Sequence, residues 1–254
     1  RSSDLFEAGL RENMVPQDAT AVVESANLAE LVVDFESFLL EHQLGGQVQL
    51  QGNQATFSLI GKAAHGSTPS KGVNAATFLA KYLHRFEFDQ AGAESFLHLL
   101  ADHLHLDFEG VNLGLAHRDP VMQELTMNVG LVNYQDDKGG SVVANFRYPK
   151  GTDPEKMAAQ TAQRLAGHDL SVEWGEFKEP HYVSVDDPMV KELLAVYEEQ
   201  TGLEGHEMTI GGGTYGRLMP RGVAYGALFP DSIDTMHQAN EFIAIDDLLK
   251  ATAI

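Results

Sequence analysis

Two hairpins of alternating apolar and polar residues constrain the fold of this chain most strongly. In the first, GQVQLQGNQATFSLIG (46–61), the alternation runs on both sides of Gly52-Asn53, a dipeptide typical of a tight turn. The second, ELTMNVGLVNYQDDKGGSVVANFRYP (124–149), turns within 136–140. Helical periodicity precedes or follows these hairpins and predicts helices at about 28–42, 74–86 and 94–104. Hairpins that alternate with helices predict an α+β / α/β architecture of antiparallel sheets covered by helices on one face.

The character of the sequence changes near residue 180. Before it, Asp153 caps a helix that begins with Pro154 and ends at Gly167, and a strand is predicted at 170–177. The segment FKEPHYVSVDDP then links to a second region. That region predicts a helix at 188–201, strands at 206–210 and 223–229, and a closing helix from about 245. We therefore expect a domain boundary near residue 180.

Composition excludes several classes of partner. The formal net charge of −20 over 254 residues argues against nucleic acid and against anionic membrane surfaces. No stretch reaches the ~18 consecutive apolar residues of a membrane span. The absence of cysteine fits a reducing compartment, so we expect a cytoplasmic protein. The first residues, RSSDLFEAGLRENMVP, contain neither an initiator Met nor a signal-peptide core, and we expect the chain to be part of a longer protein.

A glycine-rich segment, TIGGGTYGR (209–217), has the G-x-G-x-x-G spacing of a dinucleotide loop. Such a loop opens a helix, whose amide groups hold the pyrophosphate. Here Pro220 and Gly222 follow, and then a short apolar run that reads as a strand. The sequence therefore favours a carboxylate over NAD as the group that the glycines approach, although an NAD-dependent oxidoreductase stays as an alternative.

Several polar residues stand where reactive groups often do. His65 lies in the polar loop GKAAHGSTPSKG. His237 has three acidic residues near it in the sequence: Asp231 and Asp234 before it and Glu241 after it. Each histidine taken alone is better interpreted as a solvated surface residue. Asn13 and Arg147 lie beside strands, and Arg is suited to bidentate binding of a carboxylate.

Two further patterns imitate catalytic motifs. On the helix at 94–104, His98, Asp102 and His105 share one face, and His105-x-Asp107 resembles a metal-ligand pair. Leucines surround them, so a solvated helix edge is the simpler interpretation. Glu198 and Glu199 are neighbours on an amphipathic helix and point about 100° apart, which indicates a solvated face.

Taken together, five segments resemble the co-catalytic zinc metallopeptidase family that includes aminoacylase, carnosinase, acetylornithine deacetylase and succinyl-diaminopimelate desuccinylase. Within it, these segments closely resemble the peptidase V-type bacterial dipeptidases. The segments are GLRENMVP, LIGKAAHGSTPSKGVNAATFLAKYL, SVVANFRYPKGTDPEK, IGGGTYGR and VAYGALFPDSIDTMHQANEFIAIDDLLKATAI. The resemblance implies that residues 1–178 form a lid domain, of the kind that dimerises in relatives. It implies that 179–254 form the carboxy-terminal portion of the catalytic domain.

The resemblance also implies roles for single residues. His237 matches a zinc ligand, and His65 matches the lid histidine that stabilises the oxyanion. The substrate-binding positions it implies are Asn13, Arg147, Gly212, Gly213 and Thr214, with Arg147 holding the C-terminal carboxylate. His105-x-Asp107 lacks the Val-Pro that should follow the family's ligand pair, and Glu198-Glu199 lies in the wrong segment for its Glu-Glu pair.

The activity implied is hydrolysis of dipeptides that have a free C-terminal carboxylate. Two zinc ions, or other divalent metals such as Mn or Co, would activate a bridging water. Most metal ligands of the family lie in an amino-terminal half that this chain lacks. We therefore expect the chain alone to bind zinc poorly and to be inactive, as a monomer or homodimer. A deacylase of N-acyl-amino acids and a non-catalytic binding or assembly module are the alternatives.

Overall fold

The computed structural model describes residues 2–226, 228–233, 235 and 240–254. The chain forms two compact units, Arg1–Lys178 and Glu179–Ile254, and each is described by itself. None of the described helices is both long enough and apolar enough to cross a membrane.

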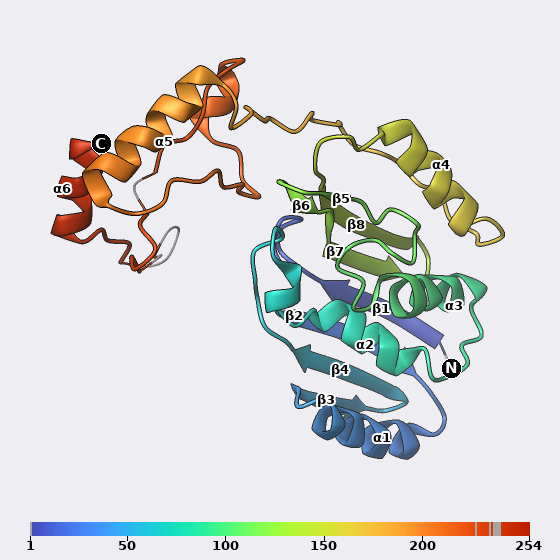
Figure 1. Cartoon of the computed structure of the whole chain (residues 1–254). Coiled ribbons are helices and arrows are strands. Elements are labelled where there is room, and N and C mark those ends of the chain that lie inside the picture. Colours follow the sequence, from blue (N-terminus) through green and yellow to red (C-terminus); the bar gives the residue numbers. More distant parts are fainter. Residues whose placement is uncertain (1, 227, 234, 236–239) are drawn as a thin grey trace. The chain divides into compact units, whose positions relative to one another are not determined.

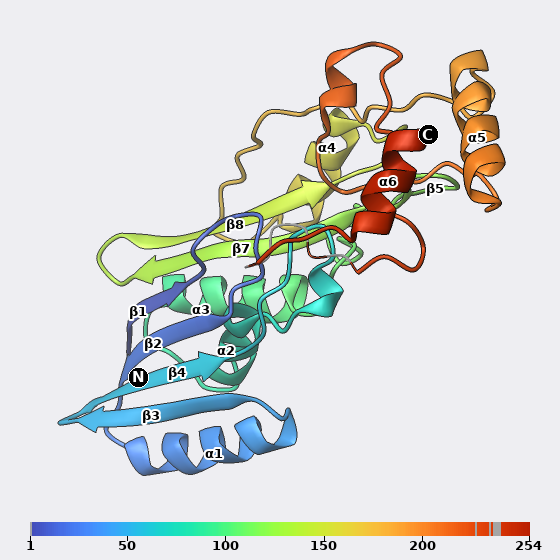
Figure 2. The same cartoon turned by 90° about the vertical axis from the view of Figure 1, so that its left-hand side faces the viewer.

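A six-stranded antiparallel sheet organises the first unit, as the hairpin pattern predicts. Figure 2 follows the strand order β3-β4-β2-β1-β7-β8. The strands are β1 (Ser2–Ala8), β2 (Asp18–Glu24), β3 (Gly45–Gln51), β4 (Gln54–Ile60), β7 (Thr126–Gln135) and β8 (Gly139–Arg147). A separate short pair is formed by β5 (Arg118–Asp119) and β6 (Gln123–Glu124). In the first hairpin Gln51 pairs with Gln54, so Gly52-Asn53 is a two-residue turn, and Gly52 has a φ of +63°.

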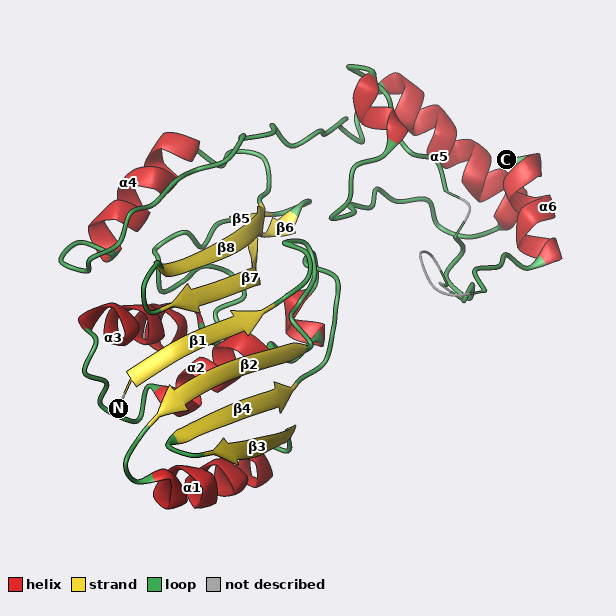
Figure 3. Cartoon of the chain, turned by 180° about the vertical axis from the view of Figure 1, so that it is seen from behind, coloured by secondary structure: helices red, strands yellow, loops and turns green. Residues whose placement is uncertain are grey.

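Helices α1 (Leu28–Glu41), α2 (Ala75–Leu83) and α3 (Ala91–His98) cover one face of this sheet. They lie in front of the sheet in Figure 1 and behind it in Figure 3. The period-two pattern of the strands explains why: Ala55, Phe57 and Leu59 of β4 are buried on the helix side. The mixed α and β fold class predicted from the sequence is confirmed.

Tyr82 of α2 lies at the centre of the core and is fully buried. Its ring packs against Phe35, Phe38 and Phe57, at centroid distances of 4.8, 5.4 and 5.6 Å. Its hydroxyl donates to the carbonyl oxygen of Leu31 in α1 at 2.5 Å, so the one polar atom of the ring is satisfied. This side chain therefore joins two helices and the sheet.

The helix predicted at 94–104 is only partly α-helical. The α-helix α3 ends at His98, and residues Leu99–Leu104 form a π-helix. Consequently His105 does not share a face with His98 and Asp102, and this prediction was wrong. The His105 ring instead meets Thr77 Oγ1 at 3.1 Å and the edge of Phe78 at 4.6 Å, and burial lowers its pKa to about 4.

The segment 170–177 contains no strand, against expectation. Its aromatic side chains pack on β8 and the residue after it: Trp174 contacts Phe146, and Phe177 stacks on Tyr148 at 4.5 Å. No ladder of backbone hydrogen bonds forms there among the described residues. Before this segment, helix α4 (Pro154–Arg164) begins as predicted, with the Asp153 carboxylate accepting from the amides of Glu155 and Lys156.

The second unit contains helices α5 (Pro188–Thr201) and α6 (Ile245–Ala253) and one short 3₁₀ turn, Tyr215–Leu218. The strands predicted at 206–210 and 223–229 are coil wherever these segments are described. A strand needs a neighbour to pair its backbone groups. The described part of this unit offers none, so the apolar pattern alone does not produce one.

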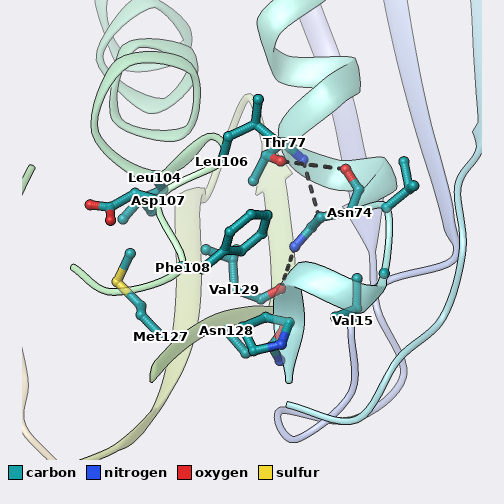
Figure 4. A pocket seen from close by; sticks show the side chains of 13 residues that line it. Val15, Asn74, Thr77, Leu104, Leu106, Asp107, Phe108, Met127, Asn128 and Val129 are labelled. Carbon is teal, nitrogen blue, oxygen red and sulfur yellow. Dashed lines mark hydrogen bonds between the residues drawn. The ribbon is translucent and has the colours of Figure 1, made fainter. Parts of the chain in front are cut away.

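Asn74 links helix α2 to the sheet, and its replacement should be destabilising. Its Oδ1 accepts from the amides of Ala76 and Thr77, and its Nδ2 donates to Val129 O of β7 at 2.8 Å (Figure 4). We expect Asn74→Ala to lower the free energy of unfolding by about 1–3 kcal/mol, from the lost cap and the lost donor. Asn74→Ser keeps a capping oxygen and should lose less. Urea unfolding measures both, and equal losses in the two variants would contradict the capping role.

Candidate functional site

Two loops meet at one end of the sheet and bring Asn13 next to His65. Residues 9–17 connect β1 to β2, and residues 61–74 connect β4 to α2. Met14 and His65 form an antiparallel bridge. The amide of Gly66 donates to Asn13 O at 2.7 Å, and that of Val15 donates to Ala64 O at 2.9 Å. The structure therefore places together two site residues that the sequence keeps far apart.

This close approach depends on two glycines. A Cβ atom at Gly66 would lie 2.9 Å from the carbonyl oxygen of Asn13. A Cβ atom at Gly130, in β7, would lie 2.2 Å from the carbonyl oxygen of Glu12. Real side chains do not tolerate such distances, so the loop of Asn13 rests directly against backbone on both sides.

Asn128 of β7 fixes the same loop from below. This side chain is 1% exposed, and its Nδ2 donates to Glu12 O at 2.8 Å and to Met14 O at 3.0 Å. The two carbonyls flank Asn13, which is itself half-buried. Because one amide group holds both neighbours, the backbone of Asn13 is anchored to the sheet.

Arg147 ends β8 at this same end of the sheet. It pairs with Thr126, and two residues further along the hairpin Asn145 pairs with Asn128. Directly paired residues two positions apart share one face of a hairpin. Met127 and Phe146 lie on the opposite face, against the core. Figure 3 views the sheet from the side that α1, α2 and α3 leave uncovered.

The paired residues at this end of the hairpin have buried polar atoms without hydrogen-bond partners among the described residues. Thr126 Oγ1, Asn128 Oδ1, Asn145 Oδ1 and Arg147 Nε are buried and have no hydrogen-bond partner in the described part of the chain. Buried polar atoms are nearly always paired in folded proteins. Burial also lowers the pKa of the Arg147 guanidinium, which is still charged at neutral pH. Arg147 Nε and Thr126 Oγ1 can donate to an anionic group, whereas the two amide oxygens can only accept. The cluster is therefore suited to a polar ligand that offers an anionic acceptor and a hydrogen-bond donor.

The ring of His65 is oriented by its own loop. The Ser67 amide donates to His65 Nδ1 at 3.2 Å, and Ser67 Oγ lies 2.7 Å from the same nitrogen. A ring nitrogen that accepts an N–H carries no proton in the neutral imidazole, so this geometry assigns the proton to Nε2. The exposed ring of His65 therefore presents Nε2–H as a donor.

The glycine-rich segment lies in the second unit. Gly212 and Gly213 are exposed, and Thr214 is half-buried just before the short 3₁₀ turn. No strand precedes the segment and no α-helix follows it directly among the described residues, so the dinucleotide interpretation has no structural support. Gly216 is required for packing, because a Cβ atom there would lie 2.9 Å from the carbonyl carbon of Val223.

The predicted zinc ligand His237 lies outside the described residues, as does Asp234. Asp231 and Glu241 are described and exposed. Within the described part of 179–254, no three metal-binding side chains come together. These residues alone do not make a metal centre. Glu198 serves a structural role, since its Oε1 accepts from the amide of Gly205 at 3.0 Å after α5.

The small cavity drawn in Figure 4 does not serve as a substrate pocket. It lies between α2, β7 and the 104–108 segment, with Asn74, Thr77 and Val129 among its lining residues. Its volume of about 20 Å³ admits roughly one water molecule. Small-molecule sites typically measure ~300–1,000 Å³. This cavity is therefore too small for a peptide.

Comparison with known proteins identifies the family. The model of "Peptidase family M20/M25/M40" matches residues 14–254. The chain belongs to this family. Its members are hydrolases and are generally metal-dependent. The resemblance inferred from the five sequence segments is thereby confirmed at the level of the family.

Two relatives illustrate how much of the family's length is present. The chain is 44% identical over 252 residues to the Beta-Ala-Xaa dipeptidase of Lactobacillus delbrueckii subsp. lactis. The aligned residues make up 99% of this chain and 53% of that protein. It is 38% identical over 251 residues to "Putative dipeptidase YtjP" of Bacillus subtilis (strain 168), with 98% and 53% covered. The chain thus spans about half the length of these curated relatives.

Sequence reasoning missed Thr126, Asn128 and Asn145. A signal was present, because each alternates with apolar residues, as in Thr126-Met127-Asn128-Val129. The alternation shows that they share a face with Arg147 only once the register of β7 and β8 is known.

Loss of the Asn128 amide should loosen the loop of Asn13. Asn128→Ala removes two hydrogen bonds to the loop of residues 9–17. Val15 lies in this loop and the Gly66 amide donates to it, so we expect hydrogen exchange at both amides to accelerate by about tenfold or more. Asn145→Ala serves as the control, because Asn145 Oδ1 has no hydrogen-bond partner in the described part of the chain. Unchanged exchange in Asn128→Ala would contradict the anchoring role.

Proposed function

We propose that this chain forms the lid and the carboxy-terminal portion of the catalytic domain of a dizinc dipeptidase. The lid is residues 1–178, and the catalytic portion is 179–254. Membership of the peptidase family and the name of the Lactobacillus relative support a dipeptide as substrate. The observation that carries the proposal is the meeting of Asn13 and His65 at the end of the sheet where Arg147 lies.

Arg147 binds the C-terminal carboxylate of the dipeptide. Its guanidinium is half-buried, its Nε has no partner in the described chain, and Asn145 lies two residues away on the same face. A carboxylate offers two oxygens to a planar fork of N–H donors, and burial strengthens such bonds. Requiring this carboxylate near the scissile bond restricts the enzyme to short peptides. In the second unit, Gly212, Gly213 and Thr214 are further substrate-binding positions, as the family resemblance implies.

His65 donates from Nε2 to the carbonyl oxygen of the scissile bond. The oxygen gains negative charge as the tetrahedral intermediate forms, so the donor binds the transition state more strongly than the substrate. Ser67 holds the ring in the tautomer that has the proton on Nε2. Asn13 contacts the substrate beside it, positioned by the bridge between Met14 and His65.

Two zinc ions, or Mn or Co in their place, would supply an activated water when bound, and His237 would be one of their ligands. The other ligands belong to the length of the relatives that this chain does not span. The chain by itself is accordingly inactive. A cytoplasmic location and a monomeric or homodimeric state stay predictions.

Replacing His65 tests the oxyanion role. In the full-length enzyme, we expect His65→Ala to lower kcat for Leu-Leu by about 10²–10³-fold, because one transition-state donor is lost. Metal analysis should find the bound zinc unchanged. His117→Ala is the matched control, since His117 is an exposed imidazole of the same unit outside the site. A parallel loss of zinc in His65→Ala would assign the ring to the metal instead.

Replacing Arg147 tests recognition of the carboxylate. We expect Arg147→Met to lower kcat/KM for a free dipeptide by roughly 10–150-fold, as a charged hydrogen bond of about 1.5–3 kcal/mol is removed. The same dipeptide amidated at its C-terminus should be a poor substrate for the wild type and lose little further. Arg147→Lys keeps the charge without the fork and should fall between the two. Equal losses with both substrates would overturn this role.

A further inference from the structure

Three histidines from separate parts of the chain gather on the helical side of the first unit. His98 ends α3, His103 lies in the π-helix, and His168 follows α4. One ring nitrogen of each lies within 4.8 Å of those of the other two. The rings of His98 and His168 stack at 4.9 Å, and His103 meets them edge-on at 5.3 and 5.5 Å.

The π-helix is what brings His103 to His98. In an α-helix, residues five apart point about 140° away from each other. In a π-helix the hydrogen bond runs from residue i to i+5, so residue i+5 lies over residue i. The π-helical turn Leu99–Leu104 follows His98 directly and thereby aligns the two imidazoles. Such turns are rare and occur frequently at functional sites.

Asp102 lies behind this cluster and orients one of its members. Its Oδ2 is 2.9 Å from His98 Nδ1 and 3.0 Å from His84 Nε2, and its Oδ1 pairs with Lys81 Nζ at 3.2 Å. A carboxylate that accepts Nδ1–H leaves Nε2 of His98 with its lone pair available. This carboxylate–histidine arrangement is the usual second layer of a metal site.

Hydrogen bonds between the described rings do not hold the cluster together. Within the described part of the chain, no hydrogen bond joins the three rings, although their nitrogens lie close together. Three protonated rings at these distances would repel one another, and Arg164 adds positive charge beside His103. All three side chains are half-buried, so solvent screens this repulsion only in part.

We propose that His98, His103 and His168 bind one divalent transition metal ion of the Zn²⁺ type. Three neutral imidazoles with an open fourth position match the coordination of zinc. Nitrogen ligands select Zn²⁺, Co²⁺, Ni²⁺ or Cu²⁺ over Mg²⁺ and Ca²⁺. The site is separate from His237 and does not depend on the proposed function.

Binding of the ion would fasten helix α4 to the rest of the unit. The helix itself buries only Met157 and Thr161, and the chain beyond it continues into the unpaired 170–177 segment. A metal held between His168 and the α3 region closes that loop, and a ligand that binds only the folded state stabilises it. The sequence led us to expect that the chain binds zinc poorly, because most ligands of the catalytic centre are absent from it. The three-histidine site proposed here is a different site.

The test is a Zn²⁺ titration of the purified 254-residue chain against a chromophoric chelator. We expect one ion per chain. His103→Ala and His168→Ala should each weaken binding more than about 100-fold. Asp102→Asn should weaken it about 10–100-fold, the range of second-layer losses. His117→Ala and His237→Ala are the controls and should bind as the wild type does. Circular dichroism checks that each variant is folded.

Melting temperatures and Co²⁺ absorption test the same three-histidine site independently. Zn²⁺ should raise the melting temperature of the wild type and of His237→Ala, but not of His168→Gln, whose half-exposed side chain makes misfolding a minor concern. Co²⁺ should give the visible absorption of a four-coordinate site only where the three histidines are intact. Zinc binding that survives in both His103→Ala and His168→Ala, that is lost in His237→Ala, or that Mg²⁺ displaces equally well would overturn the proposal.

Discussion

The amide of Asn128 is the interaction on which the proposed active surface depends. The loop of residues 9–17 has no regular structure except its bridge to His65, so its position must come from side chains and close backbone contacts. Asn128 bonds to the carbonyls on both sides of Asn13, and Gly66 and Gly130 let the backbone approach from two directions. A rigid sheet thus carries two loops that hold the polar groups, which is how enzymes commonly place reactive side chains.

The same hairpin that anchors this loop also presents Arg147. Polar atoms that are buried without partners reduce stability, so their concentration on one face of β7 and β8 is costly unless a ligand satisfies them. Under the proposed function, the free carboxylate of a peptide would supply the acceptor for Arg147 Nε, and a peptide N–H would supply a donor for the amide oxygens. The relatives are about twice the length of the chain.

The helical side of the unit carries the second departure from regular structure. The π-helix at Leu99–Leu104 breaks the α-helical rule on which the sequence interpretation of His98, Asp102 and His105 relied. The wider turn leaves His105 beside Phe78 and brings His103 to His98. Local rules of helix geometry fail here, and such failures often coincide with binding sites.

The sequence alone determined the features that depend on neighbours along the chain. The two hairpins, the Gly52-Asn53 turn and the cap of α4 at Asp153 are local, and all three occur as predicted. The sequence also identified the family, because each of the recognised motifs is a continuous segment of the chain. Only the tertiary structure decided which distant residues meet: Asn13 with His65, Asn128 with Asn145, and His168 with His98. Strand register, backbone approach at glycines and the π-helical turn set these contacts, and each depends on packing across the fold that no local pattern encodes.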